Sequence, residues 1–347
     1  MAPACHRTRP VSPERACRPA PARGSLLVPM QPPDTRIGPA VGRDQVGRGL
    51  LPALILGLGA WAVGAARLDL AGHLGVSAPA ADGLLLFATV LAVYPAIALL
   101  ERLVPADPDW NRPHGDVATD AVHLLLSGTL AQAVFQATLG VAALHAGTAL
   151  AARWGLALWP ASAPLAAQLF LAVLVAELGH YAFHRLSHEH ALVWRLHAVH
   201  HSARRLYWLN ATRFHWLDVF ALIALQSTPL LLLGAGREAL LAYTLFAATY
   251  GQVQHMNVRV RPSMLDRLFS TPTLHRWHHS IDPREGNTNY GAILIVWDLV
   301  FGTYRRPARP FDATLGVADH PDFPEGWLAQ QLSPLRRRVC GSGATDT

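Results

Sequence analysis

The amino-acid sequence predicts an all-α integral membrane protein with about four transmembrane helices, a membrane hairpin, and a helical cap on the cytoplasmic side that carries clustered histidines. Its composition supports a membrane location, because 51% of the 347 residues are hydrophobic and only 15% are charged, whereas a typical soluble domain carries about 25% charged residues. Several apolar stretches also approach the roughly 20 residues that a membrane helix needs. The histidine clusters, all between His180 and His279, predict the cap.

The charge and the cysteines argue against two classes of site. The net charge of +6 comes from arginine alone, since the chain contains no lysine, and no basic stretch is interleaved with aromatic residues. We therefore expect no nucleic-acid partner. The three cysteines, Cys5, Cys17 and Cys340, lie in predicted tails. They offer neither a disulfide framework nor a CxxC metal pair.

Both ends of the chain are predicted to be tails. Residues 1–48 are rich in proline, arginine and alanine, which is typical of disorder. They do not resemble a signal peptide, because no apolar core follows the early arginines directly. Met30 is a hypothetical alternative start. Residues 311–347 are predicted to form a C-terminal tail.

Residues 49–180 are predicted to form the transmembrane helices. Four apolar, uncharged stretches support this, the third of which is long enough for one tilted span plus an interfacial turn. They are Leu51–Ala66, Gly83–Leu100, Ala121–Ala152 and Trp154–Ala176. A soluble all-α core is the alternative, but soluble helices show a polar face and these stretches do not.

A membrane hairpin is predicted within residues 219–254. The stretch Val219–Gly234 is apolar but short and contains Pro229, and Leu240–Val253 follows after two charged residues. We expect the pair to enter the bilayer and return.

The placement of arginine predicts the orientation. Arginines occur in the N-terminal tail, in residues 101–118 and 184–213, and towards the C-terminus, whereas the opposite loops, near residues 67–82 and 149–163, carry only Arg67 and Arg153. Positive charge marks the cytoplasmic side. We therefore expect the histidines on the cytoplasmic face. The membrane itself is expected to be a bacterial inner membrane.

Three histidine clusters lie in residues 181–310. The first is His184-Arg-Leu-Ser-His188, and the other two share the pattern HxxHH: His197-Ala-Val-His200-His201 and His275-Arg-Trp-His278-His279. On a helix, residues at i, i+3 and i+4 share one face, so each cluster would direct two or three imidazoles to one point. Neutral imidazole binds iron and zinc. Eight imidazoles exceed what one tetrahedral metal uses, which indicates two metal ions.

Over residues 95–305 the sequence resembles the fatty acid hydroxylase / sterol desaturase superfamily of membrane-bound di-iron oxygenases. The resemblance rests on the three clusters and on segments placed in the same order between and after them. These segments are Asn210-Ala-Thr-Arg213-Phe-His215, Asn289-Tyr290-Gly291, Trp297-Asp298 and Phe301-Gly302-Thr303-Tyr304. Glu177 stands where this family usually has aspartate, and His180 stands where an aromatic residue or glutamine is common.

The resemblance implies a ligand set and its supporting residues. The implied metal ligands are His184, His188, His197, His200, His201, His275, His278 and His279, with His215 and His255 as further candidates. His180 shares a helix face with the first cluster, but the family does not need it. Histidine ligands require acceptors for the far ring nitrogen, and Glu177, Asn210 and Asp298 are expected to supply them.

The resemblance also implies the chemistry. We expect two iron ions that use O2 and two electrons to hydroxylate a C–H bond of a lipid, with desaturation as a variant at the same site. The electrons are expected from a separate ferredoxin, or from a cytochrome with its reductase. An alternative from another class is a zinc-dependent membrane hydrolase, although no HExxH motif is present. A purified sample could also carry zinc in place of iron.

Overall fold

The computed structural model describes residues 40–336, apart from residues 155–157, 262, 319 and 321. Most of the predicted N-terminal tail, Met30 and the three cysteines therefore lie outside the described residues. Apart from Ala40, everything described belongs to one compact unit that begins at Val41. Within the described residues the chain forms helices and turns and no β-strand, which confirms the all-α prediction.

The longer helices form the bundle, and short helices and helical turns connect them. In chain order they are α1 (Ala40–Ala66), α2 (Leu70–Leu74), α3 (Ala78–Leu103), η1 (Pro108–Asn111), α4 (Val117–Phe135), η2 (Gln136–Gly140), α5 (Val141–Trp154), α6 (Leu165–Glu189), α7 (Ala191–His201), η3 (Trp208–Thr212), α8 (Trp216–Leu232), α9 (Arg237–His255), η4 (Met264–Arg267), α10 (Pro272–His278), α11 (Pro283–Gly286), α12 (Val296–Phe301), α13 (Trp327–Gln331) and α14 (Ser333–Arg336).

Four stretches among the described residues are long and apolar enough to cross a membrane. They are Gly49–Ala66, Ala78–Leu103, Val117–Trp154 and Leu165–Glu189. Large apolar side chains on their outer faces are exposed, among them Phe87 at 59% and Leu125 at 66%. Extended apolar surfaces of this kind mark contact with lipid or with another protein. The predicted number of transmembrane helices and the membrane location are both supported.

All four stretches have bounds that differ from those that the sequence predicts, and the differences in the third and fourth bear on the architecture. The third is a 38-residue run in which the π-helical turn η2 joins α4 to α5; at about 1.5 Å per residue it is far longer than the roughly 30 Å that one crossing requires. The fourth begins at Leu165, not at Trp154, and Pro164 directly precedes it. Since α6 continues to Glu189, it carries both membrane-spanning residues and the first histidine cluster.

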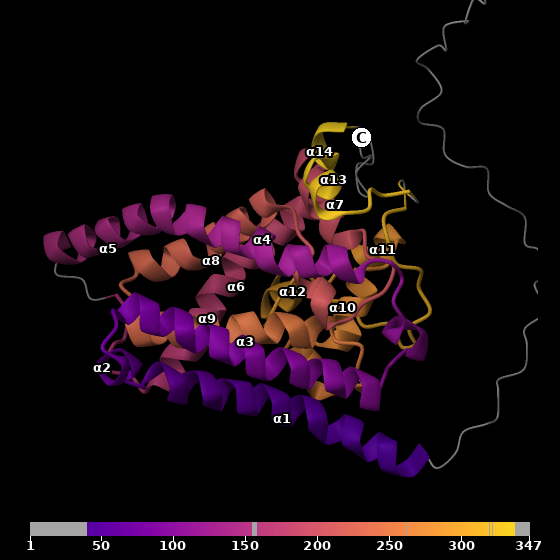
Figure 1. Ribbon diagram of the computed structural model, residues 1–347, viewed down its shortest axis with the longest axis horizontal. Coiled ribbons are helices and arrows are strands. Elements are labelled where there is room, and N and C mark those ends of the chain that lie inside the picture. The colour runs from indigo at the N-terminus through magenta and orange to yellow at the C-terminus, as the bar shows by residue number, and fades with distance from the viewer. Residues whose placement is uncertain (1–39, 155–157, 262, 319, 321, 337–347) are drawn as a thin grey trace, which may run out of the picture. The chain divides into compact units, whose positions relative to one another are not determined.

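The predicted hairpin corresponds to α8 and α9, which follow each other in the chain but pack against different neighbours, α8 mainly against α4 and α6, and α9 against α3 and α6. A short turn joins them, in which Gly234 adopts a positive φ of 80° that glycine tolerates without strain. Helix α9 packs against both α3 and α6 (Figure 1), and Leu245 and Tyr250 are fully buried there. Because protein surrounds α9, it can carry more polar residues than a helix that faces lipid.

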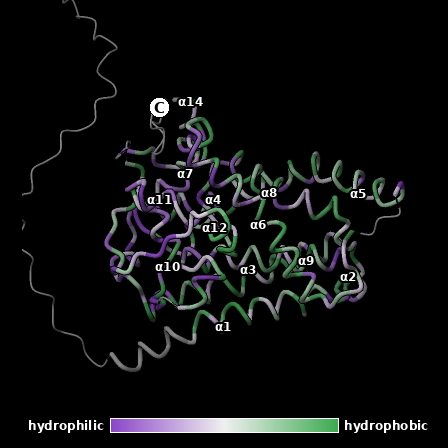
Figure 2. Tube along the Cα trace, turned by 180° about the vertical axis from the view of Figure 1, so that it is seen from behind, coloured by the Kyte–Doolittle hydropathy of each residue, from purple (hydrophilic) through white to green (hydrophobic). Residues whose placement is uncertain are grey.

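The histidine clusters gather at one end of the bundle. Helices α7, α10 and α11 lie at the end where α6 and α9 finish, and α2 lies at the opposite end (Figure 1). Hydrophilic residues concentrate around α10 and α11, whereas α1, α3 and α8 are mostly hydrophobic (Figure 2). The region predicted to be a C-terminal tail contributes α13, which packs against α4 at the same end.

Helices α6 and α8 approach closely at Gly179. A Cβ atom built on Gly179 would lie 2.2 Å from the main-chain oxygen of Leu225, a distance at which backbone must move. This approach sets the position of α8, which begins beside the histidine clusters at Trp216.

We predict that Gly179→Ala lowers the free energy of unfolding by about 1–3 kcal/mol, because an added methyl group forces the two packed helices apart. The melting temperature of the detergent-solubilised protein measures this effect. Gly128→Ala on α4 is the matched control, since a Cβ there meets nothing within 4 Å and alanine is the better helix former. An unchanged melting temperature for Gly179→Ala would contradict the close contact.

Candidate metal centre

Four helix ends supply the clustered histidines. The last turns of α6 carry His184 and His188, and α7 carries His197, His200 and His201 at i, i+3 and i+4. Helix α10 carries His275 and His278, and His279 follows directly as its C-cap. His255 is the final residue of α9. Each helix therefore ends with its imidazoles directed to one place.

The histidines form two groups. In each group one nitrogen per residue can serve as a ligand, and these nitrogens lie within 4.8 Å of one another. The first group is His184, His188, His197, His201 and His278, and the second is His200, His255, His275 and His279. All nine side chains are buried.

The first group shows nitrogens that lack partners. The Nε2 atoms of its five histidines are buried, and none has a hydrogen-bond partner. A buried polar atom without a partner costs about 1–3 kcal/mol, so five at one point call for a shared partner. A metal ion fits this place.

Four of the five Nδ1 atoms of the first group face oxygen acceptors. His184 Nδ1 lies 2.7 Å from the main-chain oxygen of Tyr290, and His278 Nδ1 lies 2.8 Å from that of Thr288. His188 Nδ1 lies 3.1 Å from Asn287 Oδ1. A carbonyl oxygen can only accept, so it places the proton on Nδ1 and leaves the Nε2 lone pair free for a metal.

A carboxylate supports the fourth histidine of this group. His197 Nδ1 lies 2.9 Å from Asp218 Oδ2, and both side chains are buried. A carboxylate behind an imidazole fixes the orientation of the ring and makes it a stronger ligand.

The second group is tighter. His275 Nε2 lies 2.8 Å from His255 Nε2 and 3.0 Å from His279 Nε2. Metal–nitrogen bonds of about 2.1 Å at right angles place two ligand nitrogens about 3 Å apart. The spacing therefore suits ligands of one ion. Outside the group, His200 Nδ1 lies 3.2 Å from the main-chain oxygen of Arg213, and His255 Nδ1 lies 3.0 Å from Asn210 Oδ1.

The two groups adjoin each other. The rings of His201 in the first group and His279 in the second are stacked, with centroids 4.4 Å apart. Burial, followed by the neighbouring imidazoles, holds the pKa of His200, His201, His275 and His279 well below the usual value for histidine. The rings are therefore neutral near pH 7, which is the form that binds metal. The donor set fits two neighbouring divalent metal ions.

Nine of the ten histidines predicted as ligands meet in these groups, and His215 does not. His215 is the N-cap of α8: its Nδ1 accepts from the main-chain N–H of Leu217, and its Nε2 lies 3.0 Å from the main-chain oxygen of Gln331. Both nitrogens are engaged in hydrogen bonds, and His215 lies outside both groups. His180 is also outside the groups, with its Nδ1 2.7 Å from Gln226 Nε2.

Of the three predicted supporting residues, one contacts a histidine directly and two act through a loop. Asn210 contacts His255 directly. Glu177 and Asp298 contact no clustered histidine in the described hydrogen bonds. Glu177 accepts from the main-chain N–H groups of Ala292, Ile293 and Leu294, and Asp298 accepts from those of Tyr290 and Gly291. They hold the loop whose Tyr290 oxygen orients His184.

Sequence reasoning missed Asp218 and Asn287 as direct partners of the histidines. Asp218 had a visible signal, because it is the one acidic residue between His215 and Gly236, and a carboxylate in an apolar segment marks a functional site. Asn287 lies in a loop eight residues beyond His279 and had no comparable signal. The main-chain acceptors depend on loop conformation and leave no mark in the sequence.

Comparison with known proteins agrees with this geometry. Residues 169–303, which contain all nine grouped histidines, match the family model described as fatty acid hydroxylase. The ornithine lipid hydroxylase OlsE of Rhizobium tropici is 40% identical over 249 residues, which are 72% of this chain and 75% of the relative. No solved structure matches the chain significantly.

More distant relatives match shorter parts of the chain. The alkylglycerol monooxygenases of Danio rerio and Homo sapiens are 33% and 30% identical to the chain. Their matches cover 44% and 39% of this chain, and 33% and 30% of the relatives. Together with the 40% identity across three quarters of the Rhizobium protein, these matches show that the chain belongs to the fatty acid hydroxylase family.

Proposed function

We propose that this chain hydroxylates a C–H bond of a membrane lipid, using two iron ions held by the two histidine groups, O2, and two electrons from a separate protein. The observation that carries the proposal is the pair of adjoining, buried, all-histidine groups at one end of a membrane bundle. Imidazole suits iron among other metals. The family and its hydroxylase and monooxygenase members support an oxygenase.

The chain's residues would hold and shield the metal ions. The free Nε2 lone pairs of the first group would bind one ion, and the second group would bind the other. Bound iron would supply the activation of O2 and the removal of hydrogen from the lipid. Because all nine side chains are buried, the site excludes bulk water, which protects a reactive oxidant from side reactions.

The alternatives are not favoured. A zinc hydrolase needs a general base beside the metal, and the two groups contain no carboxylate among the described residues. Glu177, the glutamate that the sequence predicted as a support for the histidines, instead accepts three main-chain N–H groups. The relatives described above are named as hydroxylases and monooxygenases, which favours hydroxylation over desaturation.

The substrate class follows from the relatives. Since the Rhizobium relative is named for ornithine lipid, we infer that an ornithine lipid is the first substrate to test, with alkylglycerols second. We place the histidine end on the cytoplasmic side, because most arginines flank that end and positive charge marks the cytoplasm. A soluble ferredoxin, or a cytochrome with its reductase, could reach the site from there.

We predict about two irons per chain in wild-type protein purified from iron-supplied cells, because there are two ligand groups. His188→Ala removes a ligand of the first group and should lower the content to about one iron or less. Elemental analysis of the detergent-solubilised protein measures this. His145→Ala, on the exposed face of α5, should keep wild-type content. Stoichiometric zinc together with O2-independent activity in wild type would overturn the iron proposal.

Asp218→Asn should weaken metal binding in the first group by roughly 10–100-fold, because the neutral amide makes a weaker partner for His197. Titration of the metal-free protein with Fe²⁺ under anaerobic conditions measures the affinity of each site. The loss of Fe²⁺ affinity should be confined to one of the two binding steps. Equal weakening of both steps would show that Asp218 supports the fold as a whole.

We predict that expression of the wild-type chain adds 16 mass units to one lipid class, and that His200→Ala abolishes the addition. Lipid extracts from an ornithine-lipid-producing host that lacks the gene, grown aerobically, are compared by mass spectrometry. His145→Ala is again the control and should act like wild type. If neither ornithine lipids nor alkyl lipids nor any other class shifts in mass, the proposed function fails.

A further inference from the structure

The segment 213–218 serves both metal groups. The main-chain oxygen of Arg213 lies 3.2 Å from His200 Nδ1, and the ring of Phe214 stacks on His200 with centroids 4.0 Å apart and 12° between the planes. Asp218 orients His197 at 2.9 Å. His200 belongs to the second group and His197 to the first. Any displacement of this segment therefore changes the orientation of one histidine ring in each group.

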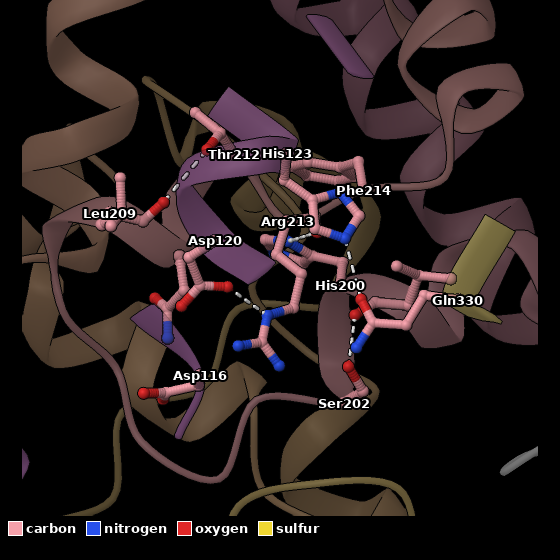
Figure 3. A network of polar contacts seen from close by, with 12 residues as sticks. Asp116, Asp120, His123, His200, Ser202, Leu209, Thr212, Arg213, Phe214 and Gln330 are labelled. Carbon is pink, nitrogen blue, oxygen red and sulfur yellow. Dashed lines mark hydrogen bonds and ion pairs between the residues drawn. The ribbon is translucent and has the colours of Figure 1, made fainter. Parts of the chain in front are cut away.

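Helix α4 holds this segment from one side. Arg213 Nε donates to Asp120 Oδ1 at 2.6 Å, and the guanidinium points towards the carboxylate (Figure 3). Asp120 also accepts from the hydroxyl of Tyr207 at 2.7 Å. Both Asp120 and Arg213 are buried, so the ion pair is shielded from water and stronger than one on the surface.

Helix α13 holds the same segment from the other side, through Gln331. Its Oε1 accepts from the main-chain N–H of Trp216 at 2.9 Å, and its Nε2 donates to the main-chain oxygen of Phe214 at 3.1 Å. The main-chain oxygen of Gln331 lies 3.0 Å from His215 Nε2. One residue thus contacts three consecutive residues next to His200 and His197.

Helix α13 is itself attached to α4 by a polar network. His123 Nε2 lies 2.8 Å from Gln330 Oε1 (Figure 3), and His123 Nδ1 lies 2.9 Å from Ser127 Oγ. Trp327 Nε1 donates to Ser127 at 3.0 Å. These contacts attach α13 to α4 beside segment 213–218. Neither α4 nor α13 lies within residues 169–303, the region that matches the family.

We propose that Gln331 is a positioning residue of the metal centre: by bonding Phe214 and Trp216 it fixes segment 213–218 and thereby the orientation of His200 and His197. The proposal rests on the proposed function in one respect, that the two histidine groups hold metal. It assigns a role at the site to a helix that begins well beyond the last histidine cluster in the chain. The competing explanation is that α13 only stabilises the fold.

Gln331→Ala tests the proposal in the full chain. Iron-loaded protein in detergent is mixed with ferrozine, a chromogenic chelator of Fe²⁺, under reducing conditions, and the rate of iron release is recorded. We expect release roughly tenfold faster than in wild type, the lower end of the losses seen when partners of metal ligands are removed. Gln136→Ala, an exposed glutamine in η2, is the matched control and should release iron at the wild-type rate.

The melting temperature of the metal-free protein separates positioning from stability. Faster release with a smaller drop in melting temperature for the metal-free than for the loaded variant supports positioning. Wild-type release together with a lowered melting temperature overturns it. If Gln331→Ala does not fold, Gln331→Glu replaces it. The introduced carboxylate would still accept from the N–H of Trp216 but would set an oxygen against the Phe214 carbonyl, so release should again be faster.

Failure of the positioning role can be distinguished from failure of the proposed function by the metal that is used. If wild-type protein binds zinc and no iron, the iron proposal fails. The release measurement is then made with Zn²⁺ and a zinc-binding dye, and faster release from Gln331→Ala still supports the positioning role. Equal release of Zn²⁺ from the variant and from wild type overturns the positioning role whatever the native metal is.

Discussion

The structure depends on directing nine buried imidazoles at two shared points. A neutral imidazole has one N–H, and a buried N–H without an acceptor is costly. For six of the nine rings the described contacts set an oxygen acceptor beside Nδ1, three of them main-chain carbonyls, from Tyr290, Thr288 and Arg213. The loops around the site can therefore be understood as a scaffold that presents acceptors to the rings.

The same requirement explains two carboxylates that do not contact the histidines. A main-chain carbonyl orients an imidazole only if its own loop is rigid. Glu177 on α6 and Asp298 on α12 together bond five consecutive main-chain N–H groups, from Tyr290 to Leu294. The loop is thereby attached to two helices, and the Tyr290 oxygen stays in place for His184. The effect of these carboxylates on the metal site is thus transmitted through the backbone.

The spacing of the histidines could predict most of the ligands, because the direction of a side chain is fixed by its position within a helix. The i, i+3, i+4 pattern needs only a regular backbone, and α6, α7 and α10 provide it. The same reasoning could not decide His215, because the residue stands at a helix start, where its Nδ1 caps α8. His255 was the harder prediction of the two, since it joins the second group only through the packing of α9 in the bundle.

The long-range part of the site could not be predicted, because it depends on contacts between distant segments. Asp218 meets His197 through the start of α8, whose position depends on the approach of α6 and α8 at Gly179. Helix α13 lies in a segment of five residues without a strong pattern, and its role is visible only from the bonds of Gln331 to segment 214–216. The predicted start of the fourth membrane stretch, Trp154, was wrong because the apolar composition continues through the turn before Pro164.

The position of the site at the end of the bundle follows from the chemistry of its supporting groups. Within lipid, the backbone N–H and C=O groups of a spanning helix bond to one another, so few of its carbonyls also accept from a neighbouring side chain, as that of Leu174 on α6 does from Trp297. Rings come from a spanning helix, as His184 and His188 do from α6, whereas their main-chain acceptors come from segments outside the candidate spans, at Tyr290, Thr288 and Arg213. The site therefore lies where helices that carry the rings meet loops that carry the acceptors. Under the proposed function, that boundary lets a lipid approach along the apolar helices while a soluble electron donor approaches from the loops.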